Sequence, residues 1–162
     1  MTLCLRFALL AWLLLAAVQT RAEEATITCP PLPAAAGLSW EAKNQGKFLL
    51  CRAMAADGRQ AFGIMLSSKR PAIRLTKEQR AEQGMISGKE VYWYYPDSGG
   101  TLVESRRITI VEFDAERFAQ IWIEAVDEED MHALQQVIGK LALAALPVLP
   151  GAKFKRPLAG NR

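Results

Sequence analysis

Two adjoining stretches decide the fold, FAQIWIEAV at residues 118–126 and DEEDMHALQQVIGKLALAA at residues 127–145. In the first stretch apolar side chains alternate, with Ile121 and Ile123 on one side and Trp122 on the other, as in a β-strand. The change of period from two to about 3.6 residues predicts a strand followed directly by an amphipathic helix. In the second stretch four apolar residues recur at the spacing of one helix face: Met131, Leu134, Ile138 and Leu141.

The predicted helix runs from residue 128 to residue 145. Asp127 can accept a hydrogen bond from the first turn, and the three acidic residues after it suit the positive end of the helix dipole. Pro147 and Pro150 follow, and proline cannot continue a helix because it has no backbone N–H.

Upstream of this helix the chain predicts β-strands joined by turns. Asp57-Gly58 and the sequence PDSGG at residues 96–100 are strong turn signals. A short exposed helix is predicted at residues 76–83, capped by Thr76 and ended by Gly84. Strands are predicted at residues 38–43, 47–55, 60–67, 89–95, 101–113 with a bend at Arg106 and Arg107, and 118–126.

Strands linked by hairpins and followed by one long helix are typical of an α+β domain. We expect an antiparallel sheet of five to seven strands with the long C-terminal helix packed on one face. Residues 23–146 are predicted to form this single domain. Residues 147–162 are predicted to be a flexible basic tail, with four Lys or Arg and no acidic residue.

Residues 1–22 predict a signal peptide. Arg6 precedes a run of 12 apolar residues at 7–18, which is shorter than the roughly 20 that a membrane-spanning helix needs. Thr20 and Ala22 are acceptable at a cleavage site, so we place cleavage after Ala22. An uncleaved anchor and a buried N-terminal helix are the alternatives. We expect the mature protein to be periplasmic or secreted, with no stable membrane insertion after cleavage.

The cysteine count becomes informative once the signal peptide is removed. Cleavage removes Cys4 and leaves Cys29 and Cys51, an even pair in an exported chain, which predicts one disulfide. A redox pair would favour Cys-x-x-Cys spacing, which the sequence lacks. A zinc site needs further ligands, and His132 is the single histidine. We assign no metal site and no cofactor.

The charges of the chain are unevenly placed. After cleavage the net charge is +1, yet residues 43–80 carry nine basic and two acidic residues, and residues 112–130 carry eight acidic residues and one basic residue. These blocks of +7 and −7 either attract each other across the fold or form a surface that steers a charged partner. A mature charge near zero argues against nucleic acid as that partner.

The sequence contains no catalytic signature. A Ser-His-Asp triad would have to use His132, whose neighbours on the helix are polar, and no Gly-x-Ser-x-Gly motif is present. The acidic residues at 112–130 leave three interpretations open: a carboxylate-dependent hydrolase, a calcium site, or a solvated surface. We name no catalytic residue.

The most unusual string is YWYY at residues 92–95. In a strand, successive residues of this string face opposite sides, so Tyr92 and Tyr94 form one pair and Trp93 and Tyr95 the other. One of the two pairs must pack on the core. The other pair, with two arginines on the returning strand, is a candidate partner-binding surface, because exposed Tyr, Trp and Arg anchor many interfaces. Packing within the sheet core is the alternative explanation. The predicted site comprises Tyr92, Trp93, Tyr94, Tyr95, Arg106 and Arg107.

These features predict an exported, non-enzymatic protein that binds a protein partner. In size, signal and layout the chain resembles small exported α+β domains that bind other proteins, including immunity proteins that neutralise secreted bacterial toxins. That resemblance implies a periplasmic toxin inhibitor as the most concrete function. A small carboxylate-dependent hydrolase and a carrier of a small molecule or lipid are the alternatives. The sequence does not fix the oligomeric state.

We expect the exported protein to begin at Glu23, because cleavage after Ala22 removes the apolar run. Intact-mass measurement of the purified mature protein tests this. The mass should match residues 23–162 less the hydrogens lost in forming one disulfide. A mass matching the full chain would show an uncleaved anchor instead.

Overall fold

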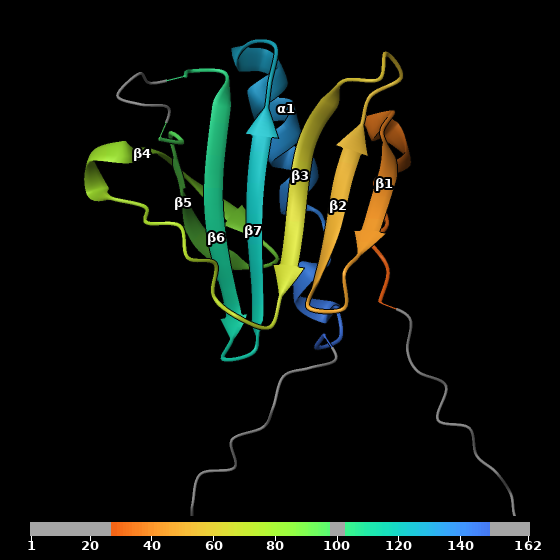
Figure 1. Ribbon diagram of the computed structural model, residues 1–162. Helices are drawn as coiled ribbons and strands as arrows, with labels where there is room; N and C mark the ends of the chain where they lie inside the picture. The colour runs from red at the N-terminus through yellow and green to blue at the C-terminus, as the bar shows by residue number, and fades with distance from the viewer. Residues whose placement is uncertain (1–26, 98–102, 150–162) are drawn as a thin grey trace, which may run out of the picture.

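The structure, a computed structural model, describes residues 27–97 and 103–149. The predicted signal peptide, its cleavage after Ala22 and residues 150–162 of the predicted tail lie outside these residues. Seven strands form one antiparallel sheet in the order β1-β2-β3-β7-β6-β5-β4, and helix α1 lies behind it (Figure 1). The α+β prediction is confirmed.

The strand bounds are β1 (Ser39–Asn44), β2 (Phe48–Met54), β3 (Gln60–Ser67), β4 (Arg80–Ile86), β5 (Lys89–Tyr94), β6 (Arg106–Asp114) and β7 (Arg117–Glu124). The helix α1 is Glu128–Gly139, and three short 3-10 turns lie at Ala34–Ala36, Lys77–Gln79 and Leu143–Ala145. β1 to β3 form one meander and β4 to β7 another. The two meanders meet where β3 pairs with β7.

One face of the sheet, which we call the inner face, packs against α1 and holds the core. Alternate positions of β2, β3 and β7 supply its side chains. Cys51, Ile64 and Ile121 are neighbours in register on this face and are fully buried. The predicted apolar stripe closes the core from the other side, and all four of its members are buried: Met131, Leu134, Ile138 and, just beyond α1, Leu141.

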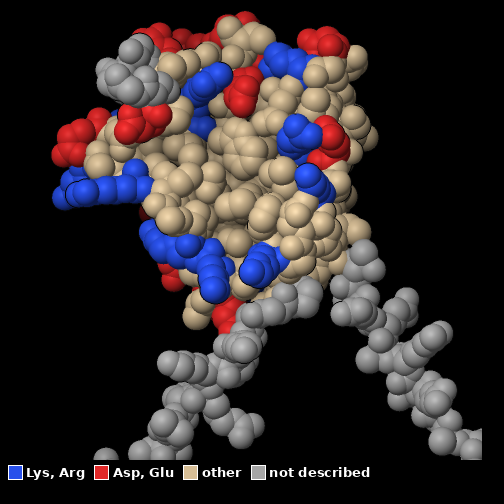
Figure 2. All heavy atoms as spheres, viewed as in Figure 1, with Lys and Arg blue, Asp and Glu red and all other residues tan. Residues whose placement is uncertain are grey.

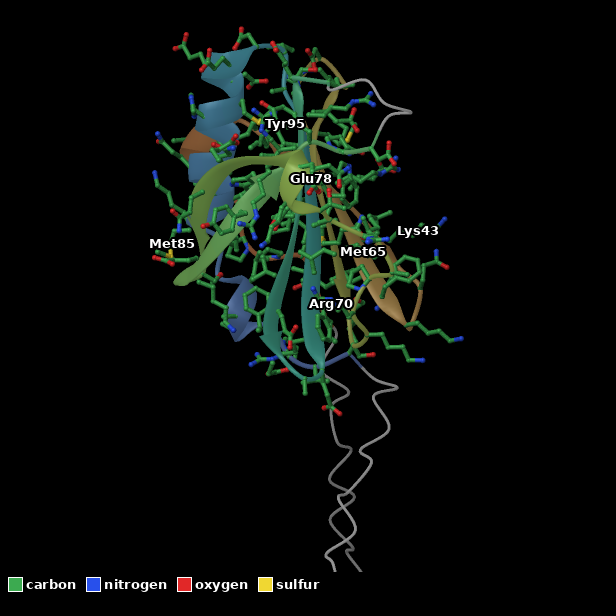
Figure 3. All side chains as sticks on the ribbon, turned by 90° about the vertical axis from the view of Figure 1, so that its left-hand side faces the viewer. Lys43, Met65, Arg70, Glu78, Met85 and Tyr95 are labelled. Carbon is green, nitrogen blue, oxygen red and sulfur yellow. A yellow bond between two sulfur atoms is a disulfide. The ribbon has the colours of Figure 1, made fainter. Side chains whose placement is uncertain are left out.

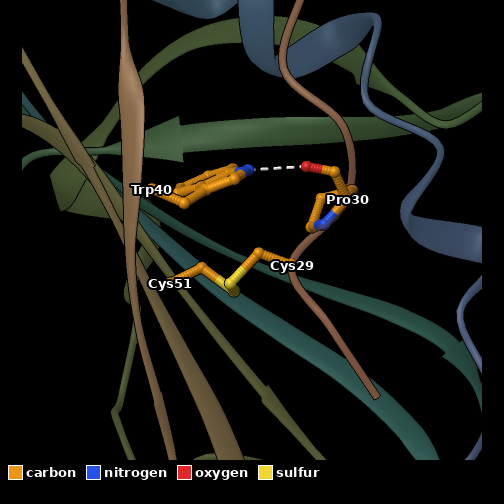
Figure 4. The surroundings of a disulfide bond; sticks show 4 residues. All are labelled: Cys29, Pro30, Trp40 and Cys51. Carbon is orange, nitrogen blue, oxygen red and sulfur yellow. Dashed lines mark hydrogen bonds between the residues drawn. A yellow bond between two sulfur atoms is a disulfide. The ribbon is translucent and has the colours of Figure 1, made fainter. Parts of the chain in front are cut away.

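The N-terminal segment also covers the inner face, and a disulfide holds it there. Cys29 is bonded to Cys51 of β2, with the two Cα atoms 5.8 Å apart, as predicted (Figure 4). Beside the bond, the indole Nε1 of Trp40 donates to the carbonyl of Pro30 at 2.6 Å. The Trp40 ring also meets Phe62 edge-on, with ring centres 5.4 Å apart. These contacts join the start of the domain to β1, β2 and β3.

The predicted exposed helix at residues 76–83 is wrong. Only Lys77–Gln79 make a single 3-10 turn, and from Arg80 the chain enters β4. A helix this short is marginal by itself, whereas β4 gains an antiparallel partner in β5, with Gln83 opposite Tyr92. Strand pairing therefore outweighs the helical propensity of this segment.

The helix predicted at residues 128–145 is too long, because α1 ends at Gly139. Beyond it the chain turns inward and buries Leu141 and Leu143. Ser87, at the tip of the β4–β5 hairpin, fixes this turn. Its hydroxyl donates to the carbonyl of Leu141 at 2.7 Å and accepts from the amide of Leu143 at 2.9 Å. A contact far away in sequence thus ends the helix earlier than the prolines would.

Two further boundaries differ from the prediction. β6 begins at Arg106, so Arg106 and Arg107 start a strand rather than bend a longer one, and residues 101–102 lie outside the described chain. Leu149 is buried against the core, so the ordered domain extends past the predicted limit at residue 146. Among the described residues no helix is both long and apolar enough to cross a membrane.

We expect reduction of the Cys29–Cys51 bond, whose sequence separation is 22, to lower the free energy of unfolding by about 3 kcal/mol, because the bond restricts the unfolded chain. Urea unfolding with and without dithiothreitol measures the difference. The Cys29→Ala variant is the control, since it should be as unstable as the reduced protein and insensitive to dithiothreitol. Equal unfolding midpoints for the oxidised and reduced protein would contradict this role.

Candidate binding surface

The opposite face of the sheet, which we call the outer face, carries no helix among the described residues (Figure 1). Its centre is uncharged, and Lys, Arg, Asp and Glu lie around that centre (Figure 2). The strand registers explain this pattern, because one row of neighbouring side chains crosses all seven strands and is charged only near its ends. The row is Glu41, Arg52, Gly63, Trp122, Ile108, Tyr94 and Arg80.

Trp122 lies in the middle of this row, and its indole covers Gly63 on the neighbouring strand. A Cβ atom added to Gly63 would lie 2.1 Å from Cζ2 of Trp122, which is far inside van der Waals contact. The missing side chain at Gly63 is therefore what lets the indole lie across β3. Trp122 is half-buried, so one part of the ring packs on the sheet and the rest faces outward.

Apolar side chains extend this aromatic centre. In the next row along the strands, Leu50, Met65 and Ile110 are half-buried, with Gln120 between the last two. In the view turned by 90°, Met65 lies on the side away from α1, whereas Met85 lies on the side of the helix (Figure 3). Trp, Tyr, Met and Arg are enriched at the cores of protein interfaces. The composition of the outer face therefore suits contact with another protein.

The predicted aromatic string contributes to the outer face only in part. Tyr92 and Tyr94 face outward, and the Arg80 guanidinium lies 4.2 Å from the ring centre of Tyr92, which is 41% exposed. Trp93 is 1% exposed within the core. This corrects the prediction for Trp93, because the alternation that exposes its neighbours turns its own side chain to the inner face.

Tyr95 and Arg107 belong to a polar cluster on the inner side, between β4, β6 and α1. Arg107 Nε donates to both carboxylate oxygens of Glu82, at 2.9 and 3.0 Å, and the guanidinium lies 4.2 Å from the ring centre of Tyr95. Gln135 of α1 donates to the same carboxylate. The Arg107 side chain is 11% exposed. Glu82 of β4 therefore links β6 to α1, because it accepts from both Arg107 and Gln135. Arg106, the residue before Arg107, is exposed on the outer face.

A groove opens at one side of the outer face, where β5 and β6 separate. The two strands are paired at one position, Tyr94 opposite Ile108. Below it lies a groove of about 360 Å³, within the range of roughly 300–1,000 Å³ that is typical of binding pockets. Its walls come from the β3–β4 connection, β5 and β6. Apolar side chains line it (Ile73, Leu75, Tyr92 and Ile110), and so do four charged ones, Arg70, Lys89, Glu90 and Glu112.

Side chains bridge the gap between the two strands. Thr109 is buried, and its hydroxyl donates to the carbonyl of Tyr92 at 2.9 Å. Lys89 Nζ donates to the carbonyls of Glu112 and Phe113 at 2.6 and 3.0 Å. These bonds satisfy backbone groups that a continuous ladder would have paired. The carbonyls of Tyr92, Glu112 and Phe113 are therefore hydrogen-bonded even though β5 and β6 are separated here.

Two carboxyl groups, Glu78 before β4 and Asp114 at the end of β6, have shifted pKa values. A hydrogen bond from the Thr76 hydroxyl lowers the pKa of Glu78. The backbone amide of Glu116, and then the side chain of Arg117, lower the pKa of Asp114. Both groups are therefore ionised at neutral pH. A carboxyl group that donates a proton in catalysis needs the opposite shift.

Four carboxylates line a hollow of about 870 Å³ beside the Arg107 cluster, but each has another role or faces solvent. Glu82 is bound to Arg107, and Asp127 caps α1 by accepting from the amide of Asp130 at 2.8 Å. Glu128 is 3.8 Å from His132, and both side chains are largely exposed. The fourth, Glu104, is exposed. Within residues 27–97 and 103–149 no group of three or more His, Cys, Asp or Glu could hold a metal ion.

Comparisons with protein families, with curated proteins and with solved structures found no match to this chain. The candidate surface is therefore defined by its geometry. Its central pair, Trp122 and Gly63, is not part of the predicted site. The alternation in β7 already places Trp122 opposite Ile121 and Ile123, but its pairing with Gly63 depends on β7 lying next to β3.

We expect Gly63→Ala to lower the free energy of unfolding by about 1–3 kcal/mol, because the new methyl group displaces the indole. In a Trp122→Ala background the same change should be neutral or stabilising, because alanine restricts the unfolded chain. Urea unfolding of the four proteins gives the coupling energy. An equal cost of Gly63→Ala in both backgrounds would exclude the contact with Trp122 as the cause.

Proposed function

We propose that this protein is an exported, non-enzymatic binding protein that holds a protein partner on the outer face of its sheet. The observation that carries the proposal is the Trp122 surface, a half-buried indole with Leu50, Met65 and Ile110 beside it, on a face that no described helix covers. An apolar sheet face normally packs against another layer, and contiguous exposed apolar surface marks interaction sites. A partner would supply that layer.

The shape of the surface favours a protein over a small molecule. Small molecules bind in concave pockets that bury most of their area, whereas Trp122 and its neighbours lie on the broad face of a sheet. Proteins bury about 800 Å² each in a standard interface and concentrate affinity in a few Trp, Tyr and Arg residues. Trp122, Tyr92 and Arg80 are residues of this kind, and the nearby groove offers room for a partner's side chain.

The proposed compartment is the periplasm or the exterior. The predicted signal peptide and the Cys29–Cys51 disulfide both suit an oxidising compartment. The most concrete version of the function is a periplasmic inhibitor that neutralises a toxin. A preformed surface on regular strands, braced by a disulfide, binds without a large ordering cost, which favours the tight binding that an inhibitor needs.

Neither alternative is favoured among the described residues, although the open groove between β5 and β6 has the volume of a small-molecule pocket. A hydrolase needs converging carboxylates, and those around Asp127 cap α1 or face solvent. A carrier needs an apolar cavity inside the domain. The apolar cavity near Leu143 and Leu149 has a volume of about 20 Å³, which is room for about one water.

We expect immobilised mature protein to retain a partner from periplasmic extract of the source cells. Trp122→Ala should weaken retention roughly 30-fold, the effect of losing a central interface residue worth about 2 kcal/mol. Tyr92→Ala, which removes a more exposed side chain, should also weaken it. Quantitative mass spectrometry of the retained proteins measures both effects.

Met85→Ala is the matched control, because Met85 is 53% exposed but lies on the helix side of the domain. It should retain the partner as the unmodified protein does. Thermal unfolding verifies that each variant is folded. If the Trp122 and Tyr92 variants retained the partner as well as the unmodified protein does, the proposed surface would be wrong. If the retained partner were a toxin whose activity did not change on binding, the inhibitor function would be wrong.

A further inference from the structure

The connection between β3 and β4, residues 68–79, crosses in front of the lower ends of β6 and β7 (Figure 1). Arg70, Ile73 and Leu75 of this segment line the groove together with Ile110 of β6. The connection contains four basic residues and one acidic residue. The acidic residue, Glu78, is engaged locally by the hydroxyl of Thr76. A strongly basic segment therefore borders the outer face along its lower end.

The strands add further positive charge to this face. Lys43 is opposite Leu50 in register, so it stands beside the apolar row, and in Figure 3 it lies on the same side as Met65. Arg80 covers the ring of Tyr92, and Arg106 is exposed at the start of β6. The predicted basic block at residues 43–80 therefore places much of its charge around the proposed binding surface.

The acidic residues of the fold neutralise only part of this charge. Arg52 is paired with Glu41 at 2.6 Å, and Arg70 with Glu112 at 2.8 Å. Several exposed cations around the outer face form no ion pair with any described residue: Lys43, Lys69, Arg74, Arg80 and Arg106. The first turn of α1, by contrast, holds three acidic residues at the other end of the domain. The two predicted charge blocks are joined by two ion pairs, Arg70–Glu112 and Arg59–Asp130.

This distribution constrains what can cover the outer face. Glu90 in the groove and Glu124 opposite Arg106 also lie on this face, but the cations on it and on the β3–β4 connection outnumber the carboxylates. A second copy of the chain would therefore bring surfaces of like charge together, which opposes association. A partner with carboxylates around an apolar centre would meet both the Trp122 surface and the cations beside it. Apolar contact would then hold the complex, and the charges would orient and accelerate its formation.

We infer that the partner held on the outer face is an acidic protein, whose carboxylates meet Lys43, Lys69 and Arg74 while its apolar side chains cover Trp122 and enter the groove. This inference rests on the proposed function and adds the charge of the partner to it. Its distinctive consequence is kinetic. Association is fast at low ionic strength and slows as salt screens the cations, while dissociation depends mainly on the apolar contact.

The experiment compares two charge reversals, Lys43→Glu and Lys140→Glu. Each changes the net charge by the same amount at an exposed residue, but Lys140 follows α1 on the helix side. The probe is the protein that the unmodified chain retains from periplasmic extract and that Trp122→Ala fails to retain. Its association rate is measured by surface plasmon resonance at about 10 mM salt, where charges interact over about 30 Å, and at about 1 M salt.

We expect Lys43→Glu to slow association about fivefold at low salt, and Lys140→Glu to leave it nearly unchanged. At high salt the three proteins should associate at similar rates. The inference of an acidic partner is wrong if the protein that requires Trp122 for retention is basic. It is also wrong if the association rate of that protein is unchanged by Lys43→Glu and by salt. In both cases the proposed function stands. Retention of no Trp122-dependent protein refutes the proposed function itself.

Vesicles that contain phosphatidylglycerol provide the final comparison, because a lipid surface also carries negative charge. We expect the unmodified protein to bind them no better than Lys43→Glu does. Strong vesicle binding that is lost in Lys43→Glu would assign the cations to a lipid surface and overturn the inference.

Discussion

A single helix has to cover one face of a seven-stranded sheet, and that constraint organises the whole domain. α1 has 12 residues, a length of about 18 Å, whereas seven strands span about 30 Å. Three other segments complete the cover: the N-terminal stretch bonded through Cys29, the turn that buries Leu143, and the β4–β5 hairpin that brings Trp93 inward. All of them serve the inner face, so within the described chain the outer face is crossed only by the β3–β4 connection near β5 and β6, and no described helix covers Trp122.

Local pattern was enough to predict the elements whose side chains meet a continuous core. The alternation at residues 60–67 predicts the bounds of β3, and the apolar stripe identifies the buried side of α1. Prediction failed where a distant residue decides the outcome. α1 stops early because Ser87 binds the turn beyond it, more than fifty residues later in the chain. Residues 80–86 are a different case, because they pair with β5 through the two-residue turn at Ser87-Gly88, a local hairpin signal that the helix prediction overlooked.

The candidate surface shows the same division. The string at residues 92–95 stands out in the sequence, and Tyr92 and Tyr94 do face outward. The sequence could not show which pair is buried, because that depends on the side of the sheet that α1 covers. The position of Trp122 was harder to predict, because its indole lies over Gly63. Gly63 is about sixty residues away in the chain and is adjacent only because β3 pairs with β7.

Ile27 and Leu149 line the same small cavity, so the first and last described residues meet at one end of the sheet. The described chain is therefore nearly a closed ring. A short linker between the two ends, with a new opening in a turn such as the one at Asp57-Gly58, gives a circular permutant that keeps every strand neighbour. Such a permutant moves its termini to the far end of the sheet and leaves both faces as they are.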